Sequence, residues 1–263
     1  MMNKEIRYKV SLIVVRWRDK AMTRLRTALH MLGAFCLVAT RALEGQGTRL
    51  KLDTQRLGSR ADTLAVFLIR GTDTVRTGAV VDEIRVEKER LIRVYSTTDR
   101  VLGNGLDTII SSRDGLRPIA YRTRSASRIA RLSFRDLEIT GWTRLPNGDS
   151  TEVRESLPAV VYDGASFDLI IRASPLRDGF SLAVPSFLIG PNTVGTLTGS
   201  VTGTEVVNSR PCWVFKANFA GMPVTFWIDK ETRALRRQLM QPRADMGILF
   251  AIPSAANASG RAT

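Results

Sequence analysis

From residue 48 onward, short runs of β-branched and aromatic residues alternate with turn residues. The runs Thr63–Arg70 and Thr74–Val81 flank Gly71-Thr72-Asp73, and this arrangement predicts a β-hairpin. Asn104-Gly105 is typical of a tight type I′ hairpin turn, because both residue types accept a positive φ, and Asn147-Gly148 marks another hairpin turn. The pattern therefore favours antiparallel strands over most of the chain.

We expect about twelve strands in all, from the spacing of these runs. Glu83–Tyr95 is predicted to continue the first hairpin as one segment, with Ile84, Val86, Leu91 and Val94 as its apolar positions. The remaining predicted strands are Leu106–Ser111, Ile119–Arg124, Ile129–Asp136, Ile139–Leu145, Asp149–Ser156, Phe180–Phe187, Gly195–Asn208, Cys212–Phe219, Met222–Asp229 and Ala234–Gln241.

One short helix interrupts this pattern near residues 166–173. Ser166 is placed to cap it, Phe167, Ile170 and Ile171 share one face, and Pro175 ends it. We expect this helix to plug an open edge or end of the sheet. The predicted fold is thus all-β, with a strongly curved antiparallel sheet, either a half-barrel or a β-roll. Such a sheet encloses an apolar interior that suits an apolar ligand.

The first 42 residues have the features of an export leader. Met22–Arg26 is basic, residues 28–39 are apolar, and small residues follow up to Ala42. We interpret 22–42 as a signal peptide cut after Ala39 or Ala42, and 1–21 as a mis-assigned extension before the true start. An uncut signal anchor is the alternative. The apolar run is shorter than a membrane span, so the mature chain is expected to lack one.

Residues 48–250 are predicted to form a single β-rich domain, followed by a disordered tail at 251–263. The expected location is the periplasm, either free or associated with the membrane surface. The formal net charge of +14 adds little to this interpretation, because half of it lies in residues 1–42. In the remainder, basic residues are interspersed with acidic and apolar ones, which is typical of a solvated surface. No nucleic-acid partner is expected.

Few catalytic side chains remain once the leader is removed. His30 and Cys36 both lie in the leader, so the mature chain has no histidine and only Cys212. This excludes Ser-His-Asp and Cys-His catalysis, a His/Cys zinc site and an internal disulfide. We expect Cys212 to be a packed core thiol, and the sequence indicates neither a metal nor a cofactor.

Carboxylates are the remaining general acids and bases. The candidates are Asp168, Glu205, Asp229 and Glu231. Asp168 lies in the first turn of the predicted helix, where an acid interacts favourably with the helix dipole. Asp229 and Glu231 are predicted to lie at a hairpin turn with local salt bridges. A glycan hydrolase with two carboxylates stays open as an alternative.

Aromatic residues in the predicted strands, together with one arginine, are the candidate ligand-binding residues. Arg172 closes the helix and is placed either against its C-terminal carbonyls or at a pocket mouth, facing an anionic headgroup. Core packing is the default expectation for aromatic residues in strands, and lining a ligand pocket is the alternative. The full candidate set is Trp142, Arg172, Phe180, Trp213, Phe226 and Trp227.

Several short motifs resemble one known family. They are Gly-Leu-Arg-Pro at 115–118, Phe167-Asp168-Leu169, Val201-Thr202-Gly203-Thr204-Glu205 and Phe226-Trp227-Ile228-Asp229. In this order the motifs resemble the exported bacterial family called domain of unknown function 3108, over about residues 48–250. The resemblance implies a periplasmic, half-barrel-like domain without an assigned activity. More distantly, the strand-helix-strand layout is similar to lipoprotein carriers that hold acyl chains in a curved sheet. Ser209-Arg210-Pro211-Cys212 departs from the Gly-Thr-Phe turn expected before the Trp213 strand.

Three hypotheses about function follow from these observations. The first is an exported, non-catalytic binding protein that holds or shuttles a lipid or a lipoprotein acyl chain. The second is an envelope scaffold that binds a protein or glycan through its basic surface. The third is the carboxylate-based hydrolase. An apolar cavity would favour the carrier, and a filled interior would favour the scaffold. Two acids that converge in a cleft would favour the hydrolase.

Overall fold

The computed structural model describes residues 50–157, 159–189, 192–219 and 221–253. Its helical segments are η2 (Thr54–Arg56), η3 (Gly164–Ser166) and α2 (Phe167–Ala173). The strands of the first half are β1 (Arg60–Arg70), β2 (Asp73–Glu87), β3 (Arg90–Asp99), β4 (Gly105–Ser112), β5 (Pro118–Ser125), β6 (Ile129–Arg135), β7 (Glu138–Arg144) and β8 (Ser150–Ser156). Those of the second half are β9 (Tyr162–Asp163), β10 (Ser181–Leu188), β11 (Thr193–Val207), β12 (Arg210–Phe219), β13 (Met222–Asp229), β14 (Leu235–Arg243) and β15 (Met246–Ala251).

All of these strands belong to one sheet, built from two meanders. The order is β8-β7-β6-β5-β4-β3-β2-β1-β15-β14-β13-β12-β11-β10-β9. Every described pairing is antiparallel except that of β9 with β10. The strand β15 lies between β1 and β14 and hydrogen-bonds to both, with Ile248 opposite Leu68 on one side and Met240 on the other. The last described strand therefore joins the two meanders.

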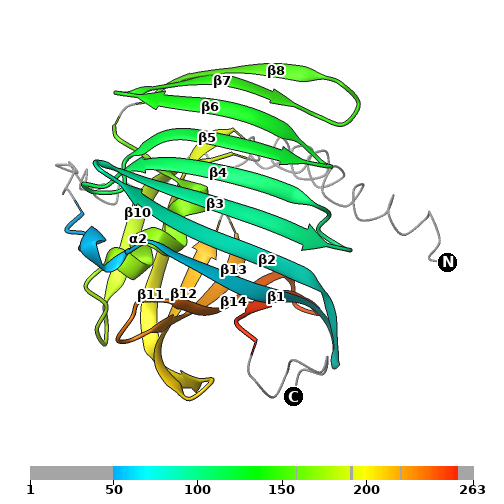
Figure 1. The fold of residues 1–263 in the computed structure, drawn as a ribbon, viewed down its shortest axis with the longest axis vertical. Coiled ribbons are helices and arrows are strands. Elements are labelled where there is room, and N and C mark those ends of the chain that lie inside the picture. Colours follow the sequence, from blue (N-terminus) through cyan, green and yellow to red (C-terminus); the bar gives the residue numbers. More distant parts are fainter. Residues whose placement is uncertain (1–49, 158, 190–191, 220, 254–263) are drawn as a thin grey trace, which may run out of the picture. The chain divides into compact units, whose positions relative to one another are not determined.

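The sheet curls so that strands far apart in its order meet across the interior. Phe134 of β6 and Phe187 of β10 are in edge-to-face contact, with ring centroids 6.1 Å apart. They share a buried cluster with Val153 of β8 and Val161, which precedes β9. Figure 1 shows β2–β8 fanning across one side and β10–β14 crossing on the other. This confirms the predicted all-β, strongly curved antiparallel sheet with one short helix.

The helix α2 packs inside this curve. Its seven residues are all buried, and Phe167, Ile170 and Ile171 belong to the largest apolar cluster. That cluster also holds Ile84 of β2, Leu91 of β3 and residues of β10–β14. The helix thus touches both meanders, and Figure 1 shows it between them. It lies against the concave face of the curled sheet.

The start of this helix differs from the sequence prediction. Ser166 occupies the N-cap position, but its hydroxyl makes no capping hydrogen bond. The residue that caps the preceding turn is Asp163, whose Oδ1 accepts a hydrogen bond from the Ala165 backbone N–H at 2.9 Å. Because η3 continues directly into α2, the capping carboxylate lies three residues earlier than expected.

Two turn predictions were wrong. The range Glu83–Tyr95 is not one segment: β2 ends at Glu87, Lys88 adopts a left-handed φ of 50°, and β3 runs back from Arg90. Asn104-Gly105 does not form a two-residue turn, because Gly105 already pairs with Thr97 in the sheet. The turn there is longer and is held by Asp99, whose Oδ1 accepts from two backbone N–H groups. The turn at Asn147-Gly148 is confirmed between β7 and β8.

β9 and β15 were not predicted, so fewer strands were expected than the sheet contains. β9 has only two residues, which is too short for any periodicity. β15 is a short run in which only Gly247 and Phe250 are buried, so it shows no alternation of apolar and polar residues.

The predicted leader (22–42), the extension (1–21) and nearly all of the predicted tail (251–263) lie outside the described residues. Among the described residues, no helix has the length and apolar character needed to cross a bilayer. The described strands begin and end within the predicted 48–250 domain, apart from Ala251.

Gly199 in β11 has no room for a side chain. A Cβ there would overlap the ring of Phe215 and lie 2.7 Å from the Lys216 carbonyl oxygen. Phe215 is itself held under Phe167, with ring centroids 6.3 Å apart. We predict that Gly199→Ala lowers the free energy of unfolding by about 1–3 kcal/mol, measured by urea denaturation.

Gly58→Ala is the matched control, because no atom lies within 4 Å of a Cβ built at Gly58. It should leave the denaturation midpoint almost unchanged or slightly raised. Equal midpoints for the two variants would show that the packing around Phe215 is looser than described.

Candidate functional site

A buried ion network links the helix to the first meander. The Arg93 guanidinium of β3 donates to both carboxylate oxygens of Asp82 on β2, at 2.7 and 2.8 Å. It also donates to both oxygens of Asp168 on α2, at 2.6 and 3.1 Å. All three side chains are buried. One arginine therefore fixes the helix onto two strands.

The network extends to the other meander through Arg172. Its Nη1 lies 3.6 Å from Asp168, and its Nε donates to the Arg233 carbonyl oxygen at 2.8 Å. Arg233 follows β13 in the second meander, and its φ of 58° turns that carbonyl toward the helix. Two acids and two arginines are thus neutralised together inside the protein.

The pKa values reflect this pairing. Burial by itself lowers the pKa of Arg93, but the charges of Asp168 and Asp82 outweigh burial and raise it well above its ordinary value. Burial raises the pKa of Asp82, and Arg93 more than compensates, so that the net shift is downward. Arg172 has a pKa lowered mainly by burial, which Asp168 only partly offsets. Asp82 and Arg93 therefore stay ionised, because each has an opposite charge beside it.

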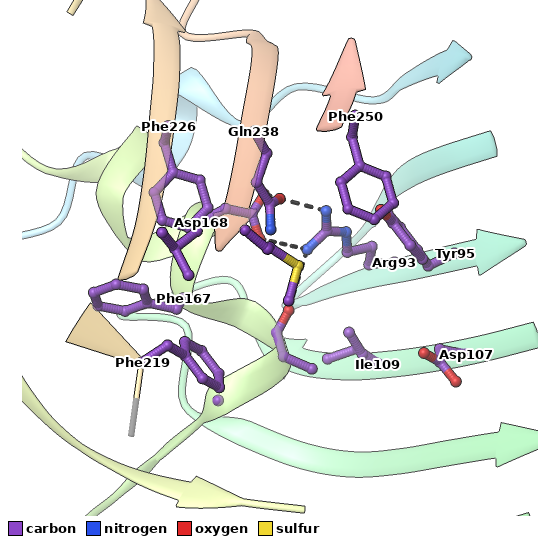
Figure 2. A pocket seen from close by; sticks show the side chains of 14 residues that line it. Arg93, Tyr95, Asp107, Ile109, Phe167, Asp168, Phe219, Phe226, Gln238 and Phe250 are labelled. Atoms are coloured by element: carbon purple, nitrogen blue, oxygen red, sulfur yellow. Dashed lines mark hydrogen bonds and ion pairs between the residues drawn. The ribbon is translucent and has the colours of Figure 1, made fainter. Parts of the chain in front are cut away.

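A cavity of about 230 Å³ lies next to this network. Most of its wall is apolar, and Arg93 and Asp168 form part of the polar wall. Figure 2 shows their ion pair beside the rings of Phe167, Phe219 and Phe226, with Phe250 on another side. The complete lining is Arg93, Tyr95, Asp107, Ile109, Gly164, Ala165, Phe167, Asp168, Phe219, Val224, Phe226, Gln238, Met240 and Phe250.

The cavity lies between the two meanders. β3 and β4 supply one wall, β12–β15 supply the other, and η3 and the first turn of α2 cover one end. Tyr95, Asp107, Gln238 and Met240 are only half-buried, so the cavity reaches the surface on their side. The arrangement offers an apolar chamber with polar groups along one wall.

Asp163 lies just before the cavity-lining residues Gly164 and Ala165. It is fully buried, and its Oδ2 has no hydrogen-bond partner. Burial raises the pKa of this carboxyl to about 7. The hydrogen bond from Ala165 lowers it, and the charge of Asp107 raises it by a smaller amount. The neutral form of this buried carboxyl is therefore favoured below about pH 7, and near that pH both forms are populated.

The structure places the six sequence-predicted ligand residues in different surroundings. Only Phe226 lines the cavity. Arg172 is fully buried in the ion network, against neither the helix carbonyls nor a pocket mouth. Phe180 and Trp213 pack at the margin of the core around α2.

The other two tryptophans lie on the outer face of the sheet. Trp227 packs with Cys212 and donates from Nε1 to Glu205 at 2.6 Å. Trp142 lies under the Arg144 guanidinium, 5.2 Å from the ring centroid. Cys212 is buried, as predicted, and burial raises the pKa of its thiol.

The four candidate carboxylates do not converge. Asp168 lines the cavity, whereas Glu205 binds Trp227 on the outer face. Asp229 accepts from the Glu231 and Thr232 backbone N–H groups and from Arg236, which confirms the predicted turn with a local salt bridge. Glu231 is exposed and paired with Arg210. Among the described residues, no group of three or more histidine, cysteine or acidic side chains is placed to hold a metal.

The sequence did not point to Asp82 and Arg93 of the ion network, or to Tyr95, Asp107 and Gln238 of the cavity wall. Asp82 lies between the buried Val80 and Ile84, at inward positions of one strand. A charged residue at an inward position is a signal for a buried partner. The position of the partner, Arg93, gives no such signal, because apolar residues occupy both faces of its strand β3.

Comparison with known proteins agrees with this architecture. The family model described as "Protein of unknown function (DUF3108)" matches residues 63–249. The chain belongs to the DUF3108 family. No curated protein sequence matches the DUF3108 chain.

Two solved structures show the range of similarity. One is a β-barrel-like protein of domain of unknown function DUF1849 from Brucella abortus, with 12% identity and a TM-score of 0.52 over 75% of this chain and 96% of that one. Its similarity shows a shared β-barrel-like fold. The other is a putative outer membrane lipoprotein-sorting protein domain from Vibrio parahaemolyticus, with 12% identity and a TM-score of 0.25 over 76% and 86% of the two chains.

Removing Arg93 should destabilise the DUF3108 domain strongly. Arg93→Ala leaves the buried carboxylates of Asp82 and Asp168 without their main cation. We predict a loss of about 3–5 kcal/mol in the free energy of unfolding, measured by urea denaturation at pH 7. Arg85→Ala, which breaks the exposed pair with Glu83 on β2, is the control and should hardly move the midpoint. Similar losses in both variants would refute the structural role of the buried network.

Asp163 should make stability depend on pH. Its pKa is raised from 3.8 to about 7 in the folded state, so the folded protein binds the proton more tightly than the unfolded chain. Stability from this group is therefore complete below about pH 4 and is lost as pH rises to about 7, by up to roughly 4 kcal/mol.

Asp163→Asn tests this dependence, because its side-chain oxygen still accepts from Ala165 while the charge is absent. The difference in unfolding free energy between variant and wild type should grow in favour of the variant from pH 4.5 to pH 8. A difference that stays constant across this range would contradict the prediction.

Proposed function

We propose that this protein is an exported, non-catalytic binding protein that holds the apolar part of an envelope lipid or of a lipoprotein acyl chain. The observation that carries the proposal is the cavity of about 230 Å³ between the two meanders, lined largely by phenylalanine and aliphatic side chains. The β-barrel-like fold supports a ligand held inside a curved sheet.

The size and lining of the cavity suit part of an acyl chain. An apolar cavity of about 150 Å³ admits a molecule the size of benzene, so this one has space for a longer aliphatic segment. Phe167, Phe226 and Phe250 are themselves buried, so a guest in contact with them would leave water. Each methylene group removed from water contributes about 0.8 kcal/mol.

The polar wall favours binding over catalysis. Arg93 and Asp168 are already engaged with each other and with Asp82, which leaves them fixed rather than free to transfer protons. A glycosidase mechanism needs a carboxylate pair facing one bond, and the four acids considered from sequence are distributed over both faces of the sheet. We therefore favour the carrier over the hydrolase.

Export completes the proposal. The basic and apolar pattern of residues 22–42 is typical of a signal peptide, and a domain covering 48–250 would then function in the periplasm. Residues 1–21 would not be part of the mature protein, and residues 251–263 would form its tail.

Filling the cavity should abolish retention of the guest. Val224 of β13 lines the cavity, so Val224→Trp places an indole where an acyl chain would lie. The full chain would be exported by a bacterial host, purified without detergent and examined by native mass spectrometry before and after solvent extraction. Wild type should carry extra mass that extracts as lipid, and Val224→Trp should carry at least tenfold less.

Thr225→Trp is the matched control, since Thr225 is the next residue of the same strand and lies on the opposite face. It should retain the lipid as wild type does. A wild-type protein without extractable mass, together with failure to take up palmitate in solution, would refute the proposal and favour the envelope scaffold. Retention by Val224→Trp would place the guest outside this cavity.

A further inference from the structure

Four arginines lie together on the outer face of the first meander. Arg122 and Arg124 belong to β5, Arg131 to β6 and Arg144 to β7, and all four are exposed. The register places Arg122 directly opposite Arg131. Figure 1 shows β4–β7 as adjacent strands. We call these residues, with Leu106, Ile129 and Trp142 between them, the arginine face.

The interspersed apolar residues follow from the same register. One row across the strands contains Leu106, Arg124, Ile129 and Arg144, in that order. The next row contains Arg122, Arg131 and Trp142. Leu106 is 47% exposed although it is aliphatic. Cations and apolar side chains are thus mixed on the outer face of these strands.

The charges of this face are not balanced from within the protein. None of the ion pairs among the described residues includes any of the four arginines. Glu152 is the closest acid in the register, where it stands opposite Trp142 at the edge strand β8. Like charges directly opposite each other on a sheet are unfavourable, so Arg122 and Arg131 lower the stability of the isolated domain. An anionic partner would relieve this repulsion.

A recess at one end of the face adds phosphate-binding chemistry. It is formed by the ends of β3, β4 and β5, and its wall includes Arg124 and Leu106. Ser96, Thr97, Thr98 and Ser125 also line it. Hydroxyl groups beside a guanidinium are common ligands of phosphate oxygens.

We propose that the arginine face docks on the surface of an anionic phospholipid bilayer. Arginines contact the phosphates, while Trp142, Leu106 and Ile129 reach the boundary between headgroups and acyl chains, where such side chains are stable. The mixture of cations with exposed apolar residues favours a membrane over a nucleic acid. This inference stands on the outer face of the sheet and does not depend on the cavity.

The test is binding of the exported, purified protein to vesicles. Wild type should float with vesicles of phosphatidylglycerol and phosphatidylcholine in equal parts, and not with phosphatidylcholine alone. Each basic residue near an anionic surface contributes about fivefold in affinity. The triple variant Arg122→Gln/Arg131→Gln/Arg144→Gln should therefore bind the anionic vesicles roughly a hundredfold more weakly. Added salt should weaken wild-type binding in the same direction.

The matched control is Arg70→Gln/Arg76→Gln/Arg177→Gln, which removes the same charge from exposed positions outside the face. It should keep most of the wild-type affinity, and both triple variants should unfold at or above the wild-type urea concentration. Val224→Trp should still bind vesicles, so that failure of the cavity proposal and of this one are distinguishable.

A second measurement uses the fluorescence of Trp142. On anionic vesicles its emission should shift to shorter wavelength, and Trp142→Phe should lose this shift while Trp213 and Trp227 remain. Absence of vesicle binding, equal binding by the two triple variants, or equal binding to neutral vesicles would each overturn the proposal. Displacement of wild type from anionic vesicles by DNA at equal phosphate concentration would assign the face to nucleic acid instead.

Discussion

The arrangement of this protein depends on the Arg93 guanidinium and the two carboxylates that share it. Asp82, Arg93 and Asp168 come from β2, β3 and α2, and their pairing is the only way for any of them to be buried as an ion. The helix is short and contributes little stability of its own. Its position inside the sheet is therefore set by charge as well as by the apolar contacts of Phe167 and Ile170.

This constraint also helps to explain the cavity that lies beside the core around α2. The ion network fixes the first turn of α2 at a definite distance from β3, and Phe167 then packs against Phe215, Phe219 and Phe226 of the second meander. Between these two contacts the walls cannot approach further. The helix keeps β3 and the second meander apart. The cavity lies beside the helix, between the contact of Asp168 with β3 and the contacts of Phe167 with the second meander.

Much of this fold could be predicted from the sequence, because local signals decide strands, turns and the helix. The hairpin at Gly71-Thr72 and the exact bounds Met222–Asp229 follow from turn residues and alternation. The site could not be predicted in the same way. Of the six residues proposed, only Phe226 lines the cavity, because alternation does not reveal which face curls inward. Arg93 and Asp168 are far apart in sequence, and only the curled sheet brings them together.

The place of β15 determines the order in which this protein can be assembled. β1 forms early in the chain, yet one of its two hydrogen-bonding edges waits for residues 246–251. Contacts between segments so distant in sequence form slowly, since a long loop must close first. During that interval β1 presents an unpaired edge from Ala65 to Arg70, the kind of segment that captures other strands. A newly made chain would have to protect this edge of β1 until β15 forms.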